Sequence, residues 1–357
     1  MTAEVIEGDL IAHREGGAGI IRLNRPKAIN ALTLGMVRDM DRALRAFAGD
    51  PAVSVVLLEG AGERGLCAGG DIRGLYESAR ANGDLGPVFW REEYILNARI
   101  ARYPKPYVAY MDGVVMGGGV GLASHGSHRI VNERTKLAMP EVGIGFFPDV
   151  GGTWLLSRAP GEVGTYYGLT GEIMTAADTI YAGLADVTIR SDAWPELRAA
   201  LTALPSVAGG DPVRKTIDRF SDNARDSVIA QHRERIDALF RYETLEEIVA
   251  ALRADGSDFA KATLETMSGK SPTSMKVTLK LLRAARASAS LEECLAREYR
   301  AALEVFDSKE FAEGVRAAII DKDRQPKWSP AKIEDVTPDI VARYFNPREG
   351  DRLDFPD

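Results

Sequence analysis

The sequence predicts an α/β protein with a helical C-terminal region. Between about residues 10 and 187, short apolar runs alternate with segments whose apolar residues recur at helical spacing. From about 194 to 320 the helical pattern is nearly continuous, with prolines at 205 and 272 as breaks. Alternation of strands and helices is typical of an α/β core. We therefore expect the first half to form a sheet with helices and the second half to pack on it or on a neighbouring subunit.

Local signals in the first half predict where its strands and helices begin and end. Asn24-Arg25-Pro26 stops the first apolar run, and Thr33 is suited to cap the helix that follows it. Residues 53–58 are continuously apolar, as expected of a buried strand. In chain order we expect a strand at 19–23, a helix after Thr33, a strand at 53–58, a helix at 88–100, a strand at 107–111, a buried helix at 118–124 and a strand at 129–131.

The second half is predicted to be helical and mostly structural. The stretch 227–252 carries charges on one side and apolar residues on the other, which is typical of a helix that packs on a core. The tail from Gln325 is rich in proline and charge, so we expect it to be loosely ordered. The predicted boundaries are an α/β core at 1–190, a helical region at 191–325 and a tail at 326–357.

Charge and composition exclude several classes of function. The formal net charge of −7 over 357 residues argues against nucleic acid or an anionic membrane as the main partner. The most apolar stretch, 107–124, is interrupted by Asp112 and crowded with glycine, so it does not resemble a membrane span. The two cysteines are far apart, the four histidines lack metal-ligand spacing, and the N-terminus lacks a signal-peptide pattern. We expect a cytoplasmic protein without a metal ion.

Three short segments resemble known motifs but lack residues or neighbouring elements that those motifs require. Residues 60–65 match GxGxxG after a strand, but no helix opens there and no second strand ending in an acidic residue follows. Residues 264–271 end like a phosphate-binding loop, yet position 264 is leucine. A GxSxG motif around Ser124 would need glycine at position 122, where this sequence has leucine. Nucleotide binding and a serine nucleophile are therefore not favoured.

Two glycine-rich segments are candidates for stabilising an oxyanion. Gly70 follows Cys67-Ala68-Gly69, and Gly118 lies in the run 116–121 ahead of a predicted helix. Glycine lets another group approach its backbone N–H closely, and the first N–H groups of a helix are unpaired. Both segments follow predicted strands, so they could share one pocket at the carboxyl ends of the sheet. Tight turns or close packing explain these glycines about as well.

Acidic residues near these glycines are candidates for general acid–base or nucleophilic chemistry. Glu141 lies among apolar residues, where burial should raise the pKa of its carboxyl group. Asp149 follows in a loop rich in proline and glycine, and two carboxyl groups in one pocket can divide their roles. Glu93 could join them from a helix, although its spacing favours a solvated helix face. Taken alone, Glu141 is better explained as a turn or helix-capping carboxylate.

These segments together resemble the crotonase, or enoyl-CoA hydratase/isomerase, superfamily. Within it, the similarity is greatest to the 3-hydroxyisobutyryl-CoA hydrolases, and it extends over nearly the whole chain. The resemblance implies a crotonase-like spiral of ββα units, a helical C-terminal region that supports homo-oligomers often built on trimers, acyl-CoA ligands and no other cofactor. The segments that carry it are Asn24-Arg25-Pro26, Asn30-Ala31-Leu32, 67–72, 91–94, 117–121, Pro140-Glu141, 145–152, 313–323 and 326–328.

The resemblance also implies roles for individual residues. Gly70 and Gly118 match the backbone N–H groups that hold the thioester carbonyl, and Glu141 matches the catalytic glutamate. Asp149 and Glu93 match positions that contact a 3-hydroxyacyl group. The positions expected to contact the CoA moiety or the rest of the substrate are Lys27, Ala28, Ala68, Asp71 and Gly117.

Two departures from the hydratases bear on the reaction. Position 121 is glycine where hydratases carry a second catalytic glutamate, and position 149 is aspartate where they usually have glycine. Hydrolysis of a short 3-hydroxyacyl-CoA, with Glu141 as nucleophile or general base and valine catabolism as the setting, is therefore the expected function. Hydration or isomerisation of an enoyl-CoA is the alternative on the same fold, and a non-catalytic acyl-CoA-binding subunit is a further one.

Overall fold

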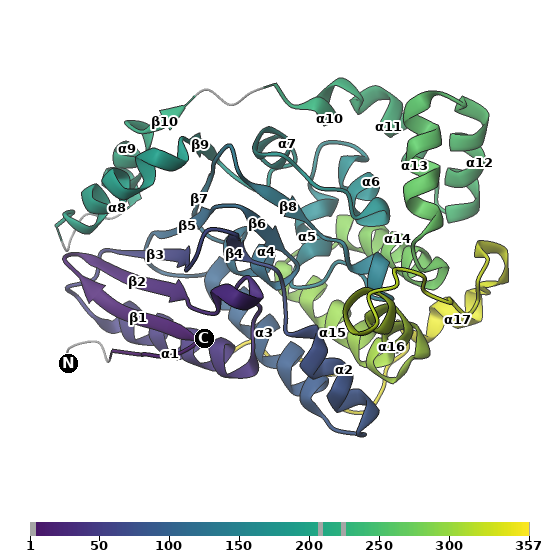
Figure 1. The fold of residues 1–357 in the computed structure, drawn as a ribbon, viewed down its shortest axis with the longest axis horizontal. Helices are drawn as coiled ribbons and strands as arrows, with labels where there is room; N and C mark the ends of the chain where they lie inside the picture. The colour runs from purple at the N-terminus through teal and green to yellow at the C-terminus, as the bar shows by residue number, and fades with distance from the viewer. Residues whose placement is uncertain (1–4, 206–209, 223–225, 357) are drawn as a thin grey trace.

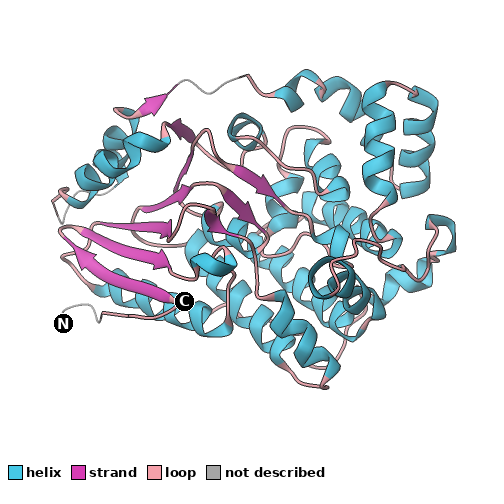
Figure 2. Ribbon diagram, in the orientation of Figure 1, coloured by secondary structure: helices cyan, strands magenta, loops and turns pink. Residues whose placement is uncertain are grey.

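The computed structural model describes residues 5–205, 210–222 and 226–356. Strands lie mainly in the N-terminal half, and the helices of the C-terminal half lie around them, those at 194–202 and 210–218 on one side and those from 245 onward on another (Figures 1 and 2). The predicted mixture of an α/β core and a helical C-terminal region is confirmed. Among these residues, no helix is long and apolar enough to cross a membrane.

The larger sheet has seven strands and is parallel in its centre. Its order is β1-β2-β3-β5-β7-β9-β10, with antiparallel pairs only at the two edges. The central strands β3 and β5 are mostly apolar and buried along nearly their whole length, which is why they could be predicted. The strands are β1 (Leu10–Glu15), β2 (Ala18–Leu23), β3 (Val55–Gly60), β5 (Tyr107–Met111), β7 (His128–Val131), β9 (Val187–Ile189) and β10 (Ser221–Asp222).

A smaller parallel sheet, in the order β4-β6-β8, lies beside the first. Its strands are β4 (Gly65–Cys67), β6 (Val114–Met116) and β8 (Lys136–Ala138). Each follows a strand of the larger sheet, so the pairs β3/β4, β5/β6 and β7/β8 each give one strand to each sheet. With the helices that follow them, these pairs form the repeated ββα units expected of the fold. The second strands are only three residues long, and apolar periodicity did not predict them.

Helices occupy most of the remaining chain. Thr33 caps the first long helix as predicted, because its hydroxyl accepts a hydrogen bond from Met36 N at 3.3 Å. The helices of the N-terminal half are α1 (Leu34–Gly49), α2 (Ile72–Arg80), α3 (Leu85–Ala101), α4 (Gly118–Ala123), α5 (Gly152–Ser157), α6 (Val163–Thr170) and α7 (Ala176–Tyr181), with short 3-10 turns η1 (Pro26–Ala28), η2 (Glu141–Ile144) and η3 (Ser191–Ala193).

The described residues of the C-terminal half are mainly helical, as predicted, and include the two-residue edge strand β10. Its helices are α8 (Trp194–Thr202), α9 (Gly210–Asp218), α10 (Val228–Gln231), α11 (Arg233–Phe240), α12 (Leu245–Asp255), α13 (Asp258–Ser268), α14 (Pro272–Arg286), α15 (Leu291–Asp307), α16 (Lys309–Val315) and α17 (Pro338–Arg343), with the π-helical turn η4 (Arg316–Ile320) and the 3-10 turn η5 (Ile333–Asp335).

The expectation of a loosely ordered tail is wrong. Val336, Val341, Tyr344 and Leu353 are buried and belong to the main hydrophobic core. The ammonium group of Lys276 also donates a hydrogen bond of 2.8 Å to the carbonyl of Val336. A few apolar side chains spaced along a polar segment are enough to anchor it, although the average composition suggested otherwise.

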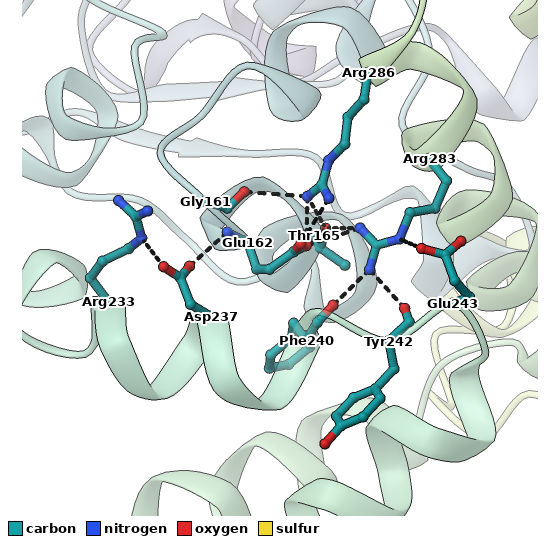
Figure 3. Close-up of polar contacts among 10 residues, drawn as sticks. All are labelled: Gly161, Glu162, Thr165, Arg233, Asp237, Phe240, Tyr242, Glu243, Arg283 and Arg286. Carbon is teal, nitrogen blue, oxygen red and sulfur yellow. Dashed lines mark hydrogen bonds and ion pairs between the residues drawn. The ribbon is translucent and has the colours of Figure 1, made fainter.

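Two arginines of α14 join the C-terminal helices to the core (Figure 3). Glu162, which is 8% exposed, accepts hydrogen bonds from Arg283 Nη1 at 2.9 Å and Arg286 Nη2 at 2.6 Å. Arg283 also donates to the backbone carbonyls of Phe240 and Tyr242 at the end of α11, each at 2.7 Å. One buried carboxylate and two guanidinium groups thus connect α6, α11 and α14.

Candidate active site

A cavity of about 700 Å³ opens where the smaller sheet, the turn η2 and the C-terminal helices meet. The glycine-rich segments and the acidic loop, separate in the sequence, line the same cavity. The residues predicted for the site that line it are Ala68, Gly70, Glu93, Gly117, Gly118, Glu141 and Asp149.

The backbone geometry around Gly70 leaves its N–H group available. Gly70 pairs with Leu32 in an isolated parallel bridge. The two hydrogen bonds of that bridge use the flanking groups: Leu32 N donates to Gly69 O, and Asp71 N donates to Leu32 O, each at 2.8 Å. Successive peptide groups of an extended chain point in opposite directions. The N–H of Gly70 therefore does not take part in the bridge, and Gly70 lines the cavity.

Gly118 supplies a second N–H group from the start of a helix. It is the first residue of α4, and Gly117 precedes it with φ of +49°. The first N–H groups of a helix have no partner within it and carry the positive end of the helix dipole. A Cβ atom at position 118 would lie 2.5 Å from Glu93 Oε1 and 3.0 Å from Leu32 Cδ1. Only glycine fits between these groups and the cavity.

Glu141 is buried beside these glycines. Its side chain is 7% exposed, and Oε1 lies 3.0 Å from the position that a Cβ atom of Gly117 would take. Its other oxygen, Oε2, has no hydrogen-bond partner among the described residues. Burial, and then the charge of Asp149, raises the pKa of Glu141 well above its ordinary value. The expected raised pKa is confirmed, and the carboxyl group has an oxygen free to act on a ligand.

Asp149 and Glu93 add two more buried carboxyl groups. Asp149 is 6% exposed, and its Oδ2 accepts a hydrogen bond of 2.7 Å from the hydroxyl of Tyr94. Burial raises the pKa of Asp149 to about 7, while the bond from Tyr94 acts in the opposite direction. Burial and the charge of Asp149 raise the pKa of Glu93, which is 2% exposed, well above its ordinary value. The expectation that Glu93 lies on a solvated helix face is wrong.

Position 121 has no space for a second glutamate. A Cβ atom there would lie 2.6 Å from Val150 Cβ and 2.8 Å from Asn97 Nδ2. Such distances are too short for any side chain without movement of its neighbours. Val150 and Asn97 fill the space next to Gly121. The packing of this site therefore leaves no room for a carboxylate at position 121.

Three predicted residues do not line the cavity. Lys27 and Ala28 belong to the exposed turn η1. Asp71 caps α2, because its carboxylate accepts from Gly74 N at 3.4 Å, and it pairs with Arg25 at 3.2 Å. These contacts account for Asp71 within the chain. Contact of the three residues with a substrate stays a prediction.

Sequence reasoning did not identify several residues of the site. Tyr94 lies beside Glu93 in the segment 91–94, but only the folded chain places its hydroxyl against Asp149. Trp90 and Phe146 stack in the cavity wall with ring centroids 5.1 Å apart. Aromatic residues usually pack in a core, so their presence in the sequence does not indicate a site. Phe89, Lys270 and Phe311 also line the cavity, and no local signal distinguished them.

The family model described as enoyl-CoA hydratase/isomerase matches residues 18–345. The chain belongs to this family.

Several curated relatives share one name. A protein of Xenopus tropicalis named 3-hydroxyisobutyryl-CoA hydrolase, mitochondrial, is 44% identical over 96% of this chain and 89% of its own length. The human protein of the same name is 38% identical over 97% of this chain and 91% of its own length. The resemblance to this group, expected from the motifs, is confirmed.

Solved structures agree on the fold but carry other names. One described as a carnitinyl-CoA dehydratase from Mycobacterium thermoresistibile has a TM-score of 0.91 and 45% identity, covering 96% of this chain and 98% of its own. One described as an enoyl-CoA hydratase from Rhodobacter sphaeroides has a TM-score of 0.90 and 42% identity, covering 98% and 100%. The crotonase fold is therefore confirmed, while these names and those of the curated relatives differ in the reaction.

The prediction of a cytoplasmic location is wrong. The curated relatives are named mitochondrial, which points to mitochondria. The prediction rested on composition, on an N-terminus without a signal-peptide pattern and on two unpaired cysteines. Unpaired cysteines fit any reducing compartment, and a secretory signal pattern bears only on export. They could not distinguish one such compartment from another.

Proposed function

We propose that the protein hydrolyses the thioester of a short 3-hydroxyacyl-CoA, with 3-hydroxyisobutyryl-CoA as the first candidate, to the free acid and CoA. One observation carries the proposal: a single cavity holds the N–H groups of Gly70 and Gly118 and the carboxyl group of Glu141, while position 121 has no room for a second carboxylate. The names of the curated relatives favour the same reaction.

The proposed chemistry begins at the thioester carbonyl. Its oxygen accepts hydrogen bonds from Gly70 N and Gly118 N, which stabilise the negative charge that develops when the carbon becomes tetrahedral. Loss of one such donor typically costs about 3 kcal/mol of transition-state stabilisation. Glu141 either attacks the carbon, so that loss of the thiolate leaves an acyl-glutamyl anhydride that water then hydrolyses to the acid and free Glu141, or removes a proton from a water molecule that attacks the carbon directly. Collapse of the tetrahedral species breaks the C–S bond and releases the CoA thiolate, which takes up a proton.

Glu93 and Asp149 are proposed to bind the 3-hydroxyl group of the acyl chain. Both carboxyl groups line the cavity, and Glu93 Oε1 has no hydrogen-bond partner among the described residues. A buried polar oxygen without a partner is costly unless a ligand or water satisfies it. A substrate hydroxyl would do so. The aromatic wall of Phe89, Trp90 and Phe146 would contact the short carbon chain.

Hydration or dehydration of an enoyl-CoA is the second candidate, favoured by the descriptions of the two similar structures. It leaves the thioester intact and changes the absorbance of the enoyl group. Water addition of this kind is expected to use two carboxylates, and the packing around Gly121 argues against the second.

A thiol-release assay over short acyl-CoAs tests both candidates. We expect free thiol from 3-hydroxyisobutyryl-CoA, and a loss of kcat of at least about a hundredfold in Glu141→Gln. Glu92→Gln is the matched control, since Glu92 pairs with Arg38 on the surface at 2.6 Å and does not line the cavity. Absence of thiol from every short 3-hydroxyacyl-CoA, together with loss of enoyl absorbance, would favour the second candidate.

The assembly and the need for cofactors also belong to the proposal. The reaction requires only water and the protein's own groups, and CoA enters as part of the substrate. We expect a homo-oligomer, with a trimer-based assembly as the form often found in the family. Analytical ultracentrifugation of the full chain would test this, and a monomer at micromolar concentration would contradict it.

A further inference from the structure

Glu298 is a fully buried carboxylate that does not line the cavity. It lies on α15 and has no exposed surface. Its Oε2 accepts a hydrogen bond from Gly151 N at 2.7 Å, and its Oε1 accepts from Thr153 N at 3.1 Å and from the Thr153 hydroxyl. Among the described residues it forms no ion pair with an arginine, lysine or histidine. Its position is therefore explained by the backbone that it binds.

That backbone is the turn immediately after Asp149. Gly152 N donates to Asp149 O at 2.6 Å, and Gly151 has φ of +77°. Val150 between them has φ of +53°. Positive φ is rare for a β-branched residue, because the side chain crowds its own backbone. Such a conformation persists only where the surroundings hold it, and it often occurs at functional sites.

Two further contacts hold the same turn. His125 Nε2 lies 2.8 Å from the carbonyl of Val150, so this nitrogen carries the proton and donates it. Tyr299, next to Glu298, packs edge-on against the ring of Tyr94 with centroids 6.3 Å apart. Tyr94 in turn donates to Asp149. Helix α15 thus supports Asp149 in two ways: Glu298 binds the main chain that follows Asp149, and Tyr299 packs on Tyr94, which donates a hydrogen bond to Asp149.

We propose that Glu298 is a positioning residue for Asp149: by binding Gly151 N and Thr153, it holds the strained turn that places the Asp149 carboxyl group in the cavity. The inference rests on the proposed hydrolysis for its kinetic test. If Glu298 instead served only to cap α5 and stabilise the fold, its replacement would reduce folded protein without a specific effect through Asp149.

A double-mutant cycle separates these roles. In Glu298→Gln, the amide NH2 replaces one acceptor, so one of the two backbone N–H groups loses its partner. We expect kcat for thiol release to fall at least about tenfold with KM within about twofold of wild type. In an Asp149→Asn background, the same replacement should lower kcat no further, because the group that it positions is already gone. Equal losses in both backgrounds, or no loss in either, would overturn the proposal.

Milder variants and a matched control distinguish a loss of activity from a loss of folded protein. Thr153→Val removes only the hydroxyl bond and should give a smaller loss with the same dependence on Asp149, whereas Thr153→Ser should restore activity. Glu304→Gln, on the same helix but paired with Arg348 at the surface, is the control and should retain wild-type kcat. Thermal unfolding of each variant reports the folded fraction.

A crystal structure of Glu298→Gln provides a readout that does not depend on the substrate. We expect Val150 to leave positive φ and the Tyr94–Asp149 hydrogen bond to lengthen or break. An unchanged turn would overturn the inference even if the protein proved active on another acyl-CoA. A wild-type protein without thiol release, with a displaced turn in the variant, would contradict only the proposed function.

Discussion

The hydroxyl group of Tyr94 donates a 2.7 Å hydrogen bond to Oδ2 of Asp149, and both side chains are buried. This bond lowers the pKa of Asp149, whereas burial raises it. The pair links α3, which also supplies Glu93, to the loop that follows η2. The ionisation of the site therefore depends on a residue that contributes no charge of its own.

Replacement of Tyr94 by phenylalanine should raise the pKa of Asp149 above its value of about 7. The ring and its packing remain, but the donor that stabilises the carboxylate is lost, and loss of a bond to a charged group is worth about 1.5–3 kcal/mol. Carbon-13 NMR of labelled aspartate as a function of pH measures the shift. Tyr299→Phe is the control, because its hydroxyl contacts Pro87 O at 3.3 Å instead. An unchanged Asp149 titration in Tyr94→Phe would refute the prediction.

The acid limb of the activity should lie above the pH at which an ordinary glutamate titrates. Glu141 must be ionised to act as nucleophile or base, and burial together with the charge of Asp149 raises its pKa. kcat/KM should therefore rise with pH through a limb well above 4.5. In Asp149→Asn the repelling charge is absent, so the limb should move to lower pH. A shift in the opposite direction would contradict the assigned coupling.

Single-turnover hydrolysis in ¹⁸O-labelled water tests whether Glu141 acts as a nucleophile. If Glu141 forms an anhydride that water opens at the glutamyl carbon, label appears in the Glu141 side chain. Label in the product acid alone is the result for a general base and also for an anhydride that water opens at the acyl carbon, so label in Glu141 is the decisive outcome. Mass spectrometry of the peptide that contains Glu141 reads the result, and Glu141→Gln is the unlabelled control.

Much of the fold follows from local patterns, but the site depends on tertiary contacts. The apolar run of β3 and the Thr33 cap of α1 could be predicted because burial on both faces and a capping side chain leave local signals. Strands β4, β6 and β8 have three residues each, too few for a period to show. The burial of Glu93 and the role of Glu298 depend on residues far apart in the chain, at separations such as the 147 positions between Gly151 and Glu298.

Asp149→Asn should stabilise the protein at neutral pH. In the folded state Asp149 keeps its proton until about pH 7, whereas an ordinary aspartate loses it near 3.8. The free energy of unfolding therefore falls as pH rises from about 4 to about 7, on the order of a few kcal/mol for this group. Asparagine does not titrate, and its carbonyl can still accept from Tyr94. The difference in Tm between variant and wild type should be small at pH 4, grow up to pH 7 and then stay constant. A constant difference over the whole range would count against a buried, protonated Asp149.

Gly121→Ala should destabilise the protein and lower its activity, and Gly121→Glu should not create a hydratase. A new Cβ atom would meet Val150 Cβ at 2.6 Å and Asn97 Nδ2 at 2.8 Å, and overpacking of this kind costs about 1–3 kcal/mol. Relief of the clash moves Val150, which is held at positive φ next to Asp149, so kcat should fall along with stability. Glutamate adds the cost of a buried charge.

Gly49→Ala is the control, because nothing lies within 4 Å of its new Cβ atom near the end of α1, and alanine favours a helix. Urea unfolding and parallel thiol-release and enoyl-absorbance assays measure the outcome. Hydration of an enoyl-CoA by Gly121→Glu would mean that the site can accept a second carboxylate, and that packing at position 121 does not decide between the two reactions.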